Sequence, residues 1–555
     1  MPDHPPAHTT EPLTPPGISI AQFRDAGKQL VDFIADYWQS LAAVGDPSSP
    51  TAPPTMPSPH HPVAFAMPVC STAAPGDLLR ALPEACPESP EPWDAIMRDV
   101  PALIMPGITH WQHPSFFGFF PANASPAAIL GELLSAGLGV QGMLWSTSPA
   151  CTELEMRVLD WLAKLIDLPR DMLHEPGDGR PSPGGSVIMG TASEGTLVAL
   201  VAARHRARAA TTTSNPTSSP RAHVVYTSTQ AHSSVIKAAM IAGLCAGPDA
   251  TPADPSIIAP APDGSHVRLV PTLPDLSMDA AALARLINAD ILAGRVPIAV
   301  VATVGTTGTM AIDDVDAIGR VCQEHDVWLH VDAAFAGCAA VCPEFRWMLH
   351  ARDPGALARV DSLGFNPHKW LLTNFDCHCF YTRDRAALTG ALSITPEYLR
   401  NAASDAGRVI DYRDWQVPLG RRFRALKLWF VLRSVGAAGL REYIRSHVRM
   451  GEVFESLVRS DARFEVTHPR ELSMVCFAPR PRQGELLADV NTRARELLTQ
   501  VNATGSAFLT HTVVPCSGAE TGSRFVLRLA IGGTLTREVH VRSAWQTIAA
   551  ALSKH

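Results

Sequence analysis

Between residues 184 and 380 the chain alternates amphipathic segments with short, continuous runs of apolar residues. Apolar residues spaced about three or four apart predict helices, whereas unbroken apolar runs of about four to eight residues predict strands buried on both faces. The predicted helices span residues 194–208, 233–244, 279–292 and 315–325. The predicted strands span residues 223–227, 298–304, 327–331, 362–365 and 378–382. Strands that alternate with helices indicate an α/β fold, in which helices cover both faces of a large, mostly parallel sheet.

Helical periodicity also marks both ends of the chain. Residues 18–44 carry a stripe of large apolar side chains, and a short helix is predicted at 93–101. Beyond the central region, a long helix is predicted from Tyr412 through Leu440. It is followed by predicted strands near 474–478 and 525–530 and by a last helix at 537–552. These C-terminal elements predict a second, smaller α+β unit.

The pattern divides the chain into four parts. We expect a disordered tail at 1–17, an N-terminal helical segment at 18–125, a large domain at 126–426 and a small α+β domain at 427–555. Two segments rich in Pro, Ser, Thr and Ala, 209–221 and 246–266, are expected to be loop insertions.

Composition narrows the class of protein. The chain has 555 residues, 46% of them hydrophobic, and a formal net charge of −7, which disfavours nucleic acid and anionic membranes as partners. Its longest apolar stretches, near 196–203 and 297–304, are too short to span a bilayer. The first 17 residues lack the basic and apolar regions of a secretory signal. The 11 cysteines are scattered, so we interpret them as reduced thiols of a cytoplasmic protein.

Two groups of residues are candidate metal ligands: Cys377-His378-Cys379, and the pair His110 and His113. On a strand the two cysteines share one face while His378 points to the other, so one metal ion cannot easily take all three. We therefore interpret the cysteines as packing residues and expect no metal site.

One lysine stands out in residues 361–370, which read Asp-Ser-Leu-Gly-Phe-Asn-Pro-His-Lys-Trp. Lys369 lies between a histidine and a tryptophan, and two leucines follow it. Apolar surroundings remove hydration, which disfavours the ammonium form and leaves the amine available as a nucleophile. That is the form required of a Schiff-base lysine. The alternative is an ordinary, partly exposed lysine at the end of a strand.

A glycine-rich segment at 184–195 is a candidate anion site. Its small residues allow backbone N–H groups to approach an anion at the start of a helix, where the helix dipole adds attraction. Gly190 and Gly195 have the spacing of a P-loop, but Thr196 stands where that motif requires lysine. A nucleoside-triphosphate site is therefore not expected. The alternative to an anion site is a glycine-rich turn before a capped helix.

Asp332 closes a strongly apolar predicted strand, at the carboxyl edge where α/β sheets bind ligands. A buried carboxylate needs a cationic partner. The alternative is that Asp332 caps the start of a helix.

The sequence Asn-Pro-His-Lys-Trp at 366–370, continued by 371–377, resembles the pyridoxal-phosphate lysine motif of the group II amino-acid decarboxylases. The likeness is greatest to the aromatic-L-amino-acid decarboxylases and runs from about Phe23 to the C-terminal helix. It implies fold type I of the pyridoxal-phosphate (PLP) enzymes, similar to aspartate aminotransferase, with a seven-stranded-type sheet in the cofactor-binding domain at 126–426. It also implies a homodimer with shared active sites, in which the segment 18–125 packs on the partner subunit.

The resemblance also assigns roles to single residues. It implies that Lys369 holds pyridoxal 5'-phosphate, that Asp332 keeps the pyridine nitrogen protonated and that His232 stacks on the ring. Tyr398, in a segment similar to the mobile loop of the family, is implied to return a proton to the substrate carbon. The implied cofactor-binding residues are Ala192, Ser193, His232, Thr307, Asp332, Ala334, Asn366, His368 and Lys369. The implied substrate-binding residues are Trp111, Phe120, Pro121, Ala122, Gln141, Met143, His232 and Gly420.

The expected reaction is decarboxylation of an aromatic L-amino acid to its amine and CO2, with tryptophan, phenylalanine, tyrosine and hydroxylated forms as open choices. Some relatives are aldehyde synthases, in which the loop tyrosine or the stacking histidine is replaced; Tyr398 and His232 are both present here. A catalytically silent PLP-fold binding protein is a second alternative, and the intact cofactor positions disfavour it. A nicotinamide-dependent oxidoreductase would need a glycine motif between strand and helix that the chain lacks.

Overall fold

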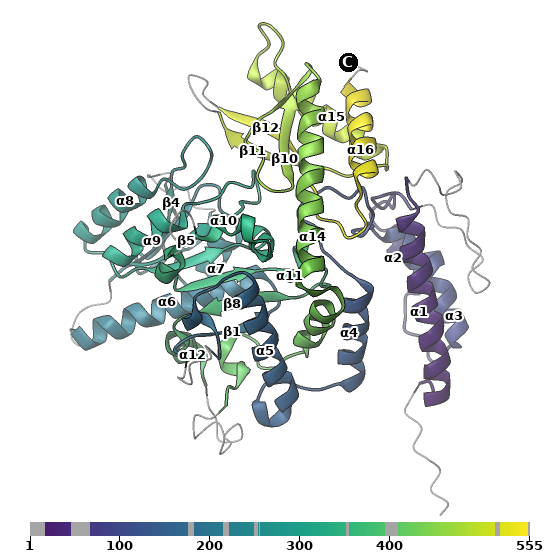
Figure 1. The fold of residues 1–555 in the computed structure, drawn as a ribbon, viewed down its shortest axis with the longest axis horizontal. Helices are drawn as coiled ribbons and strands as arrows, with labels where there is room; N and C mark the ends of the chain where they lie inside the picture. Colours follow the sequence, from purple (N-terminus) through teal and green to yellow (C-terminus); the bar gives the residue numbers. More distant parts are fainter. Residues whose placement is uncertain are drawn as a thin grey trace, which may run out of the picture.

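A computed structural model describes residues 17–45, 67–175, 182–214, 221–248, 254, 256–350, 355–394, 409–516 and 522–552, with 211–214 described as backbone only. A large sheet with its helices forms the main body, a small sheet packs at one end of it, and the N-terminal helices lie at the side (Figure 1). The predicted tail at 1–17 lies outside the described residues except for Gly17.

The large sheet has eight strands in the order β1–β8–β7–β6–β5–β2–β4–β3. Strands β2, β4, β5, β6 and β7 run parallel to one another, whereas β8 is antiparallel to both of its neighbours and β3 is antiparallel to β4. The bounds are β1 Gly185–Met189, β2 His223–Ser228, β3 Ile257–Ile258, β4 His266–Val270, β5 Val296–Thr303, β6 Trp328–Asp332, β7 Ser362–Phe365 and β8 His378–Thr382. The mostly parallel α/β fold is confirmed, and the short β3 is an edge strand added to the seven expected.

All five strands predicted in this region are confirmed, but β1, β3 and β4 were not predicted. Strand β1 begins directly at Gly185, within the segment that its glycines led us to treat as a loop. The prediction of a loop insertion at 246–266 is wrong for Ile257–Ile258, which form β3. Residues 249–253 and 255 lie outside the described part. The insertion predicted at 209–221 is helical as far as Ser214.

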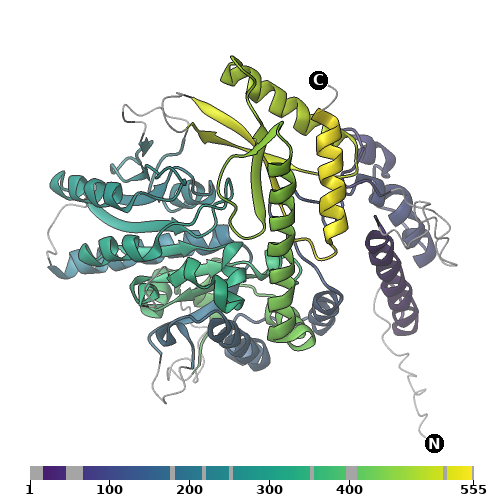
Figure 2. The ribbon, with the colours of Figure 1, turned by 45° about the horizontal axis from the view of Figure 1, so that its top comes forward.

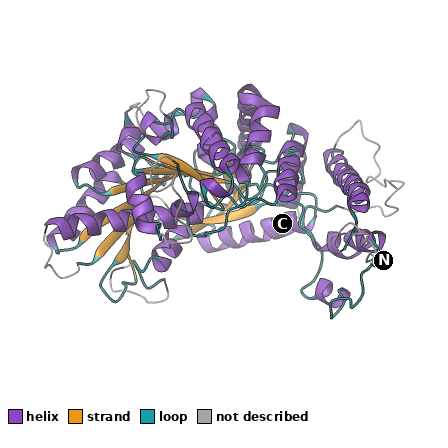
Figure 3. Cartoon of the chain, turned by 90° about the horizontal axis from the view of Figure 1, so that it is seen from below, coloured by secondary structure: helices purple, strands orange, loops and turns teal. Residues whose placement is uncertain are grey.

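Side chains of each strand alternate between two hydrophobic cores, because successive residues of a strand point to opposite faces. Val187 and Met189 of β1 face one core, whereas Ile188 faces the other. Helices therefore lie on both faces of the sheet (Figure 3). The helices on the first face are α6 Ala192–Ser214, α7 Ser234–Ile241 and α12 Arg385–Leu392. Those on the second face are α5 Pro149–Leu165, α8 Ala280–Leu292 and α9 Val315–Glu324.

The C-terminal part contains a four-stranded antiparallel sheet in the order β11–β12–β10–β9. Its elements are β9 Phe464–Val466, β10 Met474–Pro479, β11 Thr510–Pro515, β12 Ser523–Ala530, α15 Leu487–Ala503 and α16 Glu538–Leu552. This sheet packs its own core against α15, α16 and the end of the long helix α14, Arg424–Ser460. Figure 2 shows α14 extending from beside the large sheet to the small one.

The prediction of a long helix beginning at Tyr412 was wrong. Residues Tyr412–Trp415 form a single 3-10 turn, and α14 begins only at Arg424. Pro418 disfavours helical conformation at the residue before it, which accounts for the break. The helix continues past Leu440 to Ser460, with a non-helical residue at Gly436 (φ 68°). The predicted domain boundary between 426 and 427 falls in its first turn and stays a prediction.

The N-terminal helices are α1 Ile20–Ala42, α2 Asp77–Ala81 and α3 Trp93–Asp99. Ser19 caps α1 through a reciprocal bond with Gln22, and Phe33 packs with Met97 and Met105 in a small core. The helix α4, Pro126–Leu138, then leads to the main body. Much of the apolar surface of α1 and α4 stays exposed, which leaves two hydrophobic faces without cover in the single chain. Among the described helices, none is long and apolar enough to cross a bilayer.

Candidate active site

Four of the predicted site residues gather at one edge of the large sheet. Asp332 is the last residue of β6, Lys369 lies in α11 (Pro367–Trp370) just after β7, Thr307 follows β5 and His232 follows β2. Because these strands are parallel, their carboxyl ends meet at the same edge, where open α/β sheets bind ligands.

Lys369 is half-buried, and its amine has no hydrogen-bond or ion-pair partner among the described residues. Its Nζ lies 5.4 Å from the centre of the Phe120 ring. Burial lowers the pKa of Lys369, and the negative charge of Asp332 offsets this only in part. The uncharged amine is therefore favoured more than in water, which suits a nucleophile.

Asp332 presents one free carboxylate oxygen. The residue is 6% exposed, and its Oδ1 accepts a hydrogen bond from the Ala334 backbone N–H at 3.0 Å. Its Oδ2 has no partner within the described part of the chain, and no ion pair joins it to Lys369 although the two charges interact. A ligand with a protonated ring nitrogen would supply the donor that Oδ2 lacks.

His232 is held in one orientation by Ser234. The imidazole Nδ1 accepts from the Ser234 backbone N–H at 3.1 Å and lies 2.8 Å from the Ser234 hydroxyl, so the ring proton is on Nε2. Burial lowers the pKa of His232, and the charge of Asp332 opposes that effect. A neutral, fixed imidazole beside Asp332 and Lys369 is suited to cover one face of a flat ligand.

The predicted phosphate segment forms the start of α6. Ala192 is the first residue of α6, and the Gly190 N–H donates to the Glu194 carboxylate at 3.0 Å. Ser193 and Ser234 line one groove of about 350 Å³ beside the residues that follow β2. The start of α6 therefore lies near the His232 turn.

The residues around the lysine are tightly bonded. Asn366 donates its backbone N–H to the Ala334 carbonyl at 2.9 Å, and its own carbonyl accepts from the Lys369 N–H at 2.9 Å. His368 accepts the Cys377 N–H at its Nδ1, 2.8 Å away, and burial lowers its pKa to about 3. This segment is thus fixed by its backbone, independently of any ligand.

The predicted substrate-binding residues fall into separate groups in the single chain. Phe120 stacks on Phe335 with ring centres 4.2 Å apart and lies beside Lys369. Trp111 instead stacks with Phe119 at 5.8 Å. The third group is Gln141 with Gly420, because the backbone N–H of the next residue, Arg421, donates to Gln141 Oε1 at 3.1 Å.

Three further predicted substrate-binding residues make contacts within the single chain. Pro121 is buried against Gly532, and the Ala122 carbonyl accepts from Gln112 at 2.6 Å. The Met143 carbonyl accepts from the Arg413 N–H at 3.0 Å, near the Gln141 group. Tyr398 lies outside the described residues.

Sequence reasoning missed Arg528, which enters the site from β12 of the small sheet. It is 3% exposed, donates to the Gly308 carbonyl at 3.0 Å and to Thr510 Oγ1 at 2.9 Å, and its guanidinium lies 5.6 Å from the Phe120 ring centre. No acidic side chain in the described part of the chain pairs with it, and burial lowers its pKa. The signal was a charged residue within the apolar run of β12.

A buried ion pair was also missed. The Arg421 guanidinium lies 2.7 Å from Glu155 Oε1, and both side chains are 0% exposed. The same carboxylate oxygen accepts the Ile188 N–H of β1 at 2.7 Å. The pair therefore ties the Gly420 turn to the strand that precedes the phosphate segment.

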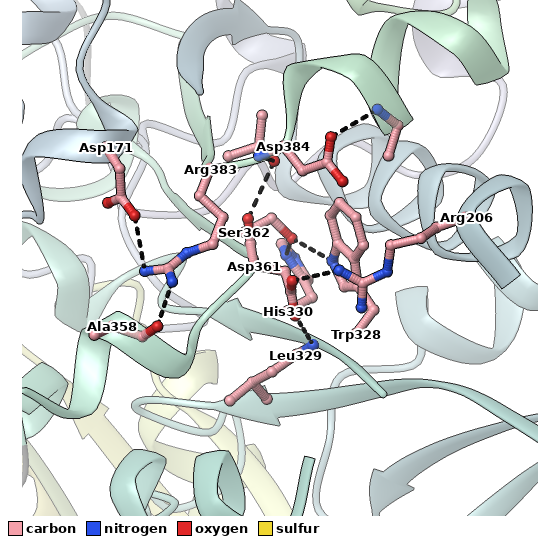
Figure 4. Close-up of polar contacts among 12 residues, drawn as sticks. Asp171, Arg206, Trp328, Leu329, His330, Ala358, Asp361, Ser362, Arg383 and Asp384 are labelled. Carbon is pink, nitrogen blue, oxygen red and sulfur yellow. Dashed lines mark hydrogen bonds and ion pairs between the residues drawn. The ribbon is translucent and has the colours of Figure 1, made fainter. Parts of the chain in front are cut away.

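The opposite edge of the sheet is fixed by charges around Asp361 (Figure 4). The Asp361 carboxylate accepts from the Leu329 N–H at 2.7 Å and from Arg206 at 2.6 Å. Next to it, Trp328 Nε1 donates to Ser362 Oγ at 2.9 Å. These bonds fix the starts of β6 and β7, so that their other ends hold Asp332 and the lysine segment in register.

Comparisons with known proteins agree with this geometry. A family model described as the pyridoxal-dependent decarboxylase conserved domain matches residues 75–480. Tryptophan decarboxylase 1 of Oryza sativa subsp. japonica is 43% identical over 521 residues, 93% of this chain and 91% of that protein. Phenylacetaldehyde synthase of Arabidopsis thaliana is 41% identical over 527 residues, 95% of each chain.

Solved structures show the same likeness. The crystal structure of Oryza sativa TDC with PLP and tryptamine matches with a TM-score of 0.83 and 40% identity, covering 98% of this chain and 99% of that one. The structure of Catharanthus roseus tryptophan decarboxylase in complex with L-tryptophan matches with a TM-score of 0.80 and 39% identity, covering 97% and 99%.

Proposed function

Because the chain belongs to the family of pyridoxal-dependent decarboxylases, we propose that it converts aromatic L-amino acids to the amine and CO2 with pyridoxal 5'-phosphate as cofactor. It is thus a carboxy-lyase. The observation that carries the proposal is the unpaired amine of Lys369, whose pKa is lowered, at the same sheet edge as the free carboxylate oxygen of Asp332. Relatives of 40% identity or more that are named tryptophan and tyrosine decarboxylases support the aromatic substrate.

The residues of the site fit the cofactor. When bound, PLP supplies an electron sink for the bond pair that is left on the substrate carbon as CO2 departs. Lys369 provides the amine that holds it, Asp332 keeps a proton on the ring nitrogen, and His232 covers a ring face. The small side chain of Ala334 would leave room for the other ring face. Ala192, Ser193, Asn366 and His368 would hold the phosphate, with Thr307 as a further cofactor-binding residue.

The chain's own groups also prepare the reaction. The lowered pKa of Lys369 keeps a fraction of its amine uncharged and able to act as a nucleophile. The same amine accepts and releases the proton that the substrate amine exchanges. The Phe120, Phe335 and Trp370 rings stack in series and exclude water from the lysine side of the site. Tyr398 is assigned the return of a proton to the substrate carbon.

The substrate ring is assigned to Phe120 and Trp111 on one side and to Gln141, Met143 and Gly420 on the other. Within one chain the described contacts of the Gln141 group are with its own neighbourhood and not with Phe120 or Lys369. We propose that a second subunit brings its Gln141 group to this site, in a homodimer with shared active sites.

The uncovered faces of α1 and α4 support the dimer. On α1, Phe23 is 57% exposed, and on α4, Leu133 is 50% exposed. Both residues belong to apolar faces of their helices, and such faces are normally buried. Exposed apolar faces of this kind mark interaction surfaces. Light scattering on the purified protein should give twice the chain mass, and Leu133→Glu should lower it; a monomeric wild-type protein that is fully active would refute shared sites.

A second candidate function is an aldehyde synthase, because phenylacetaldehyde synthase is among the similar proteins. His232 and Tyr398 are both retained in this chain, which favours the amine as product. We place the reaction in the cytoplasm, because all 11 cysteines are free thiols.

One experiment tests the function and the alternative together. The protein is incubated with tryptophan, phenylalanine, tyrosine and their hydroxylated forms, and CO2, amine, aldehyde and peroxide are measured. We expect CO2 and amine in equal amounts with little aldehyde, and no turnover by Lys369→Ala. Aldehyde and peroxide in proportion to CO2 would establish the synthase instead. Full turnover by Lys369→Ala would refute the site.

A further inference from the structure

His378 is a buried histidine directly behind the lysine segment. It is the first residue of β8 and is 1% exposed, and its Nδ1 lies 2.6 Å from the side-chain oxygen Oδ1 of Asn366. The site described so far leaves this imidazole without a role. Its bond to Asn366 is of interest because Asn366 is one of the residues assigned to the cofactor phosphate.

The direction of this hydrogen bond follows from the surroundings of the ring. Burial lowers the pKa of His378 well below its usual value, so the ring is neutral and carries one proton. The other nitrogen, Nε2, is buried and has no partner among the described residues. A buried N–H without an acceptor is costlier and rarer than an unpaired acceptor, so the proton is on Nδ1 and is donated to Asn366 Oδ1.

This bond determines which way the Asn366 amide points. The Asn366 backbone is already fixed, because its N–H bonds the Ala334 carbonyl and its carbonyl accepts from Lys369 N and from Cys338 Sγ at 3.2 Å. Rotation of the amide is the freedom that remains. With Oδ1 bound to His378, the two N–H bonds of Nδ2 face away from the imidazole, and donors are what an anion requires.

The ring also joins the lysine segment to the helix that carries Ala192 and Ser193. A Cβ added to Gly195, in the first turn of α6, would lie 2.3 Å from His378 Nε2, and one added to Gly364 of β7 would lie 2.5 Å from Cε1. The imidazole therefore occupies the space that these two glycines leave open. It lies between the start of α6 and β7.

We propose that His378 is a positioning residue for the cofactor phosphate: its Nδ1–H fixes the Asn366 amide with its donors toward the phosphate, and its ring sets the start of α6. The proposal rests on the proposed function, which assigns Asn366, Ala192 and Ser193 to that phosphate. It predicts that loss of the imidazole weakens binding of PLP specifically through the phosphate and leaves binding of the ring and aldehyde unchanged.

The test compares PLP with pyridoxal, which has the same ring and aldehyde but no phosphate. The full-length protein is freed of cofactor, each compound is titrated, and binding to Lys369 is followed by visible absorbance. For His378→Leu we expect the Kd for PLP to rise about tenfold, the scale of one hydrogen bond that serves a charged ligand, with the Kd for pyridoxal unchanged. His378→Asn, whose Nδ2 can replace the Nδ1–H donor, should bind PLP within about threefold of wild type.

His223→Leu is the matched control. His223 is another buried imidazole of the same sheet, 8% exposed, but it stands at the amino end of β2 and away from the phosphate residues. It should leave both Kd values unchanged. If His378→Leu does not fold, Asn366→Asp replaces the proposed donor with an oxygen at the same position and should raise the Kd for PLP alone.

The outcomes separate this proposal from the one on which it rests. Equal weakening of PLP and pyridoxal, or His378→Asn binding PLP as poorly as His378→Leu, would overturn the positioning role. An unchanged ratio of the two Kd values in Asn366→Asp would overturn it as well. A wild-type protein that binds no PLP at Lys369 would overturn the proposed function itself.

Discussion

Replacement of Arg421 by methionine should destabilise the protein far more than an average substitution. The guanidinium lies 2.7 Å from Glu155, donates to the Ile188 carbonyl and to Gln416 Oε1 at 3.0 Å each, and lies 4.4 Å from the Tyr412 ring centre. Methionine fills much of the volume but leaves the Glu155 carboxylate at 0% exposure, with the Ile188 N–H as its one remaining donor among the described residues. An uncompensated buried charge of this kind costs about 3–5 kcal/mol.

The double-mutant cycle isolates the interaction between the two charges. Glu155→Gln alone leaves Arg421 buried without its carboxylate and should cost a similar amount. The double variant Glu155→Gln with Arg421→Met leaves no buried charge. We therefore expect it to be less destabilised than the sum of the single variants by roughly 2 kcal/mol or more.

The assay is urea unfolding of the full-length protein followed by circular dichroism. The PLP concentration is kept constant and in excess, because a ligand that binds only the folded state raises the apparent stability by mass action. If Arg421→Met loses less than about 1 kcal/mol, or if the two single effects simply add, the two charges do not compensate each other and the reasoning is wrong.

Three further predictions concern the site and its supports. Arg528→Met should lower kcat/KM by about tenfold or more, because it removes the donors that hold the Gly308 turn next to the Phe120 ring. Arg524→Met on the same strand should not lower it, and equal kcat/KM values for the two variants in steady-state assays would contradict this prediction. Asp332→Asn should lower kcat by about a hundredfold or more, because an amide cannot hold a proton on the ring nitrogen by charge; a smaller loss in single-turnover assays would show that the carboxylate is not the partner of the ring. Burial raises the pKa of Asp313 to about 6, so this group favours the folded state at low pH and that contribution is lost as pH rises through 6. The stability of wild type relative to Asp313→Asn should therefore fall by about 2 kcal/mol between pH 4 and pH 8, and a difference that does not vary with pH in urea unfolding would refute the assignment.

The local part of the site could be predicted from the sequence. Lys369 and Asp332 each lie in a short segment whose own residues carry the signal: a lysine among apolar side chains and an aspartate that ends an apolar run. The parallel sheet follows from the same runs, and parallel strands place such ends at one edge. The placement of both residues at one sheet edge needed only neighbours in sequence, whereas their cofactor roles were implied by the family resemblance and stay predictions.

The rest depended on contacts between distant segments. Arg528 meets Gly308, and His378 meets Asn366, only after the small sheet and β8 have been placed. The glycines before β1 concealed a strand, because their small side chains indicate a turn whether or not a strand follows. The start of α14 was misplaced because apolar spacing continued through a segment that Pro418 keeps out of helical conformation.

The charges around Asp361 have a consequence for anyone who alters this protein. Strand β7 has only four residues, so these ionic contacts are about 13 Å from the turn that presents Lys369. We expect a short strand with all its hydrogen bonds made to move as one unit, so that a displacement at its start also displaces its far end. Arg206, whose side chain makes one of these contacts, is thus a position where we expect a substitution to shift Lys369 without touching any group that meets the substrate.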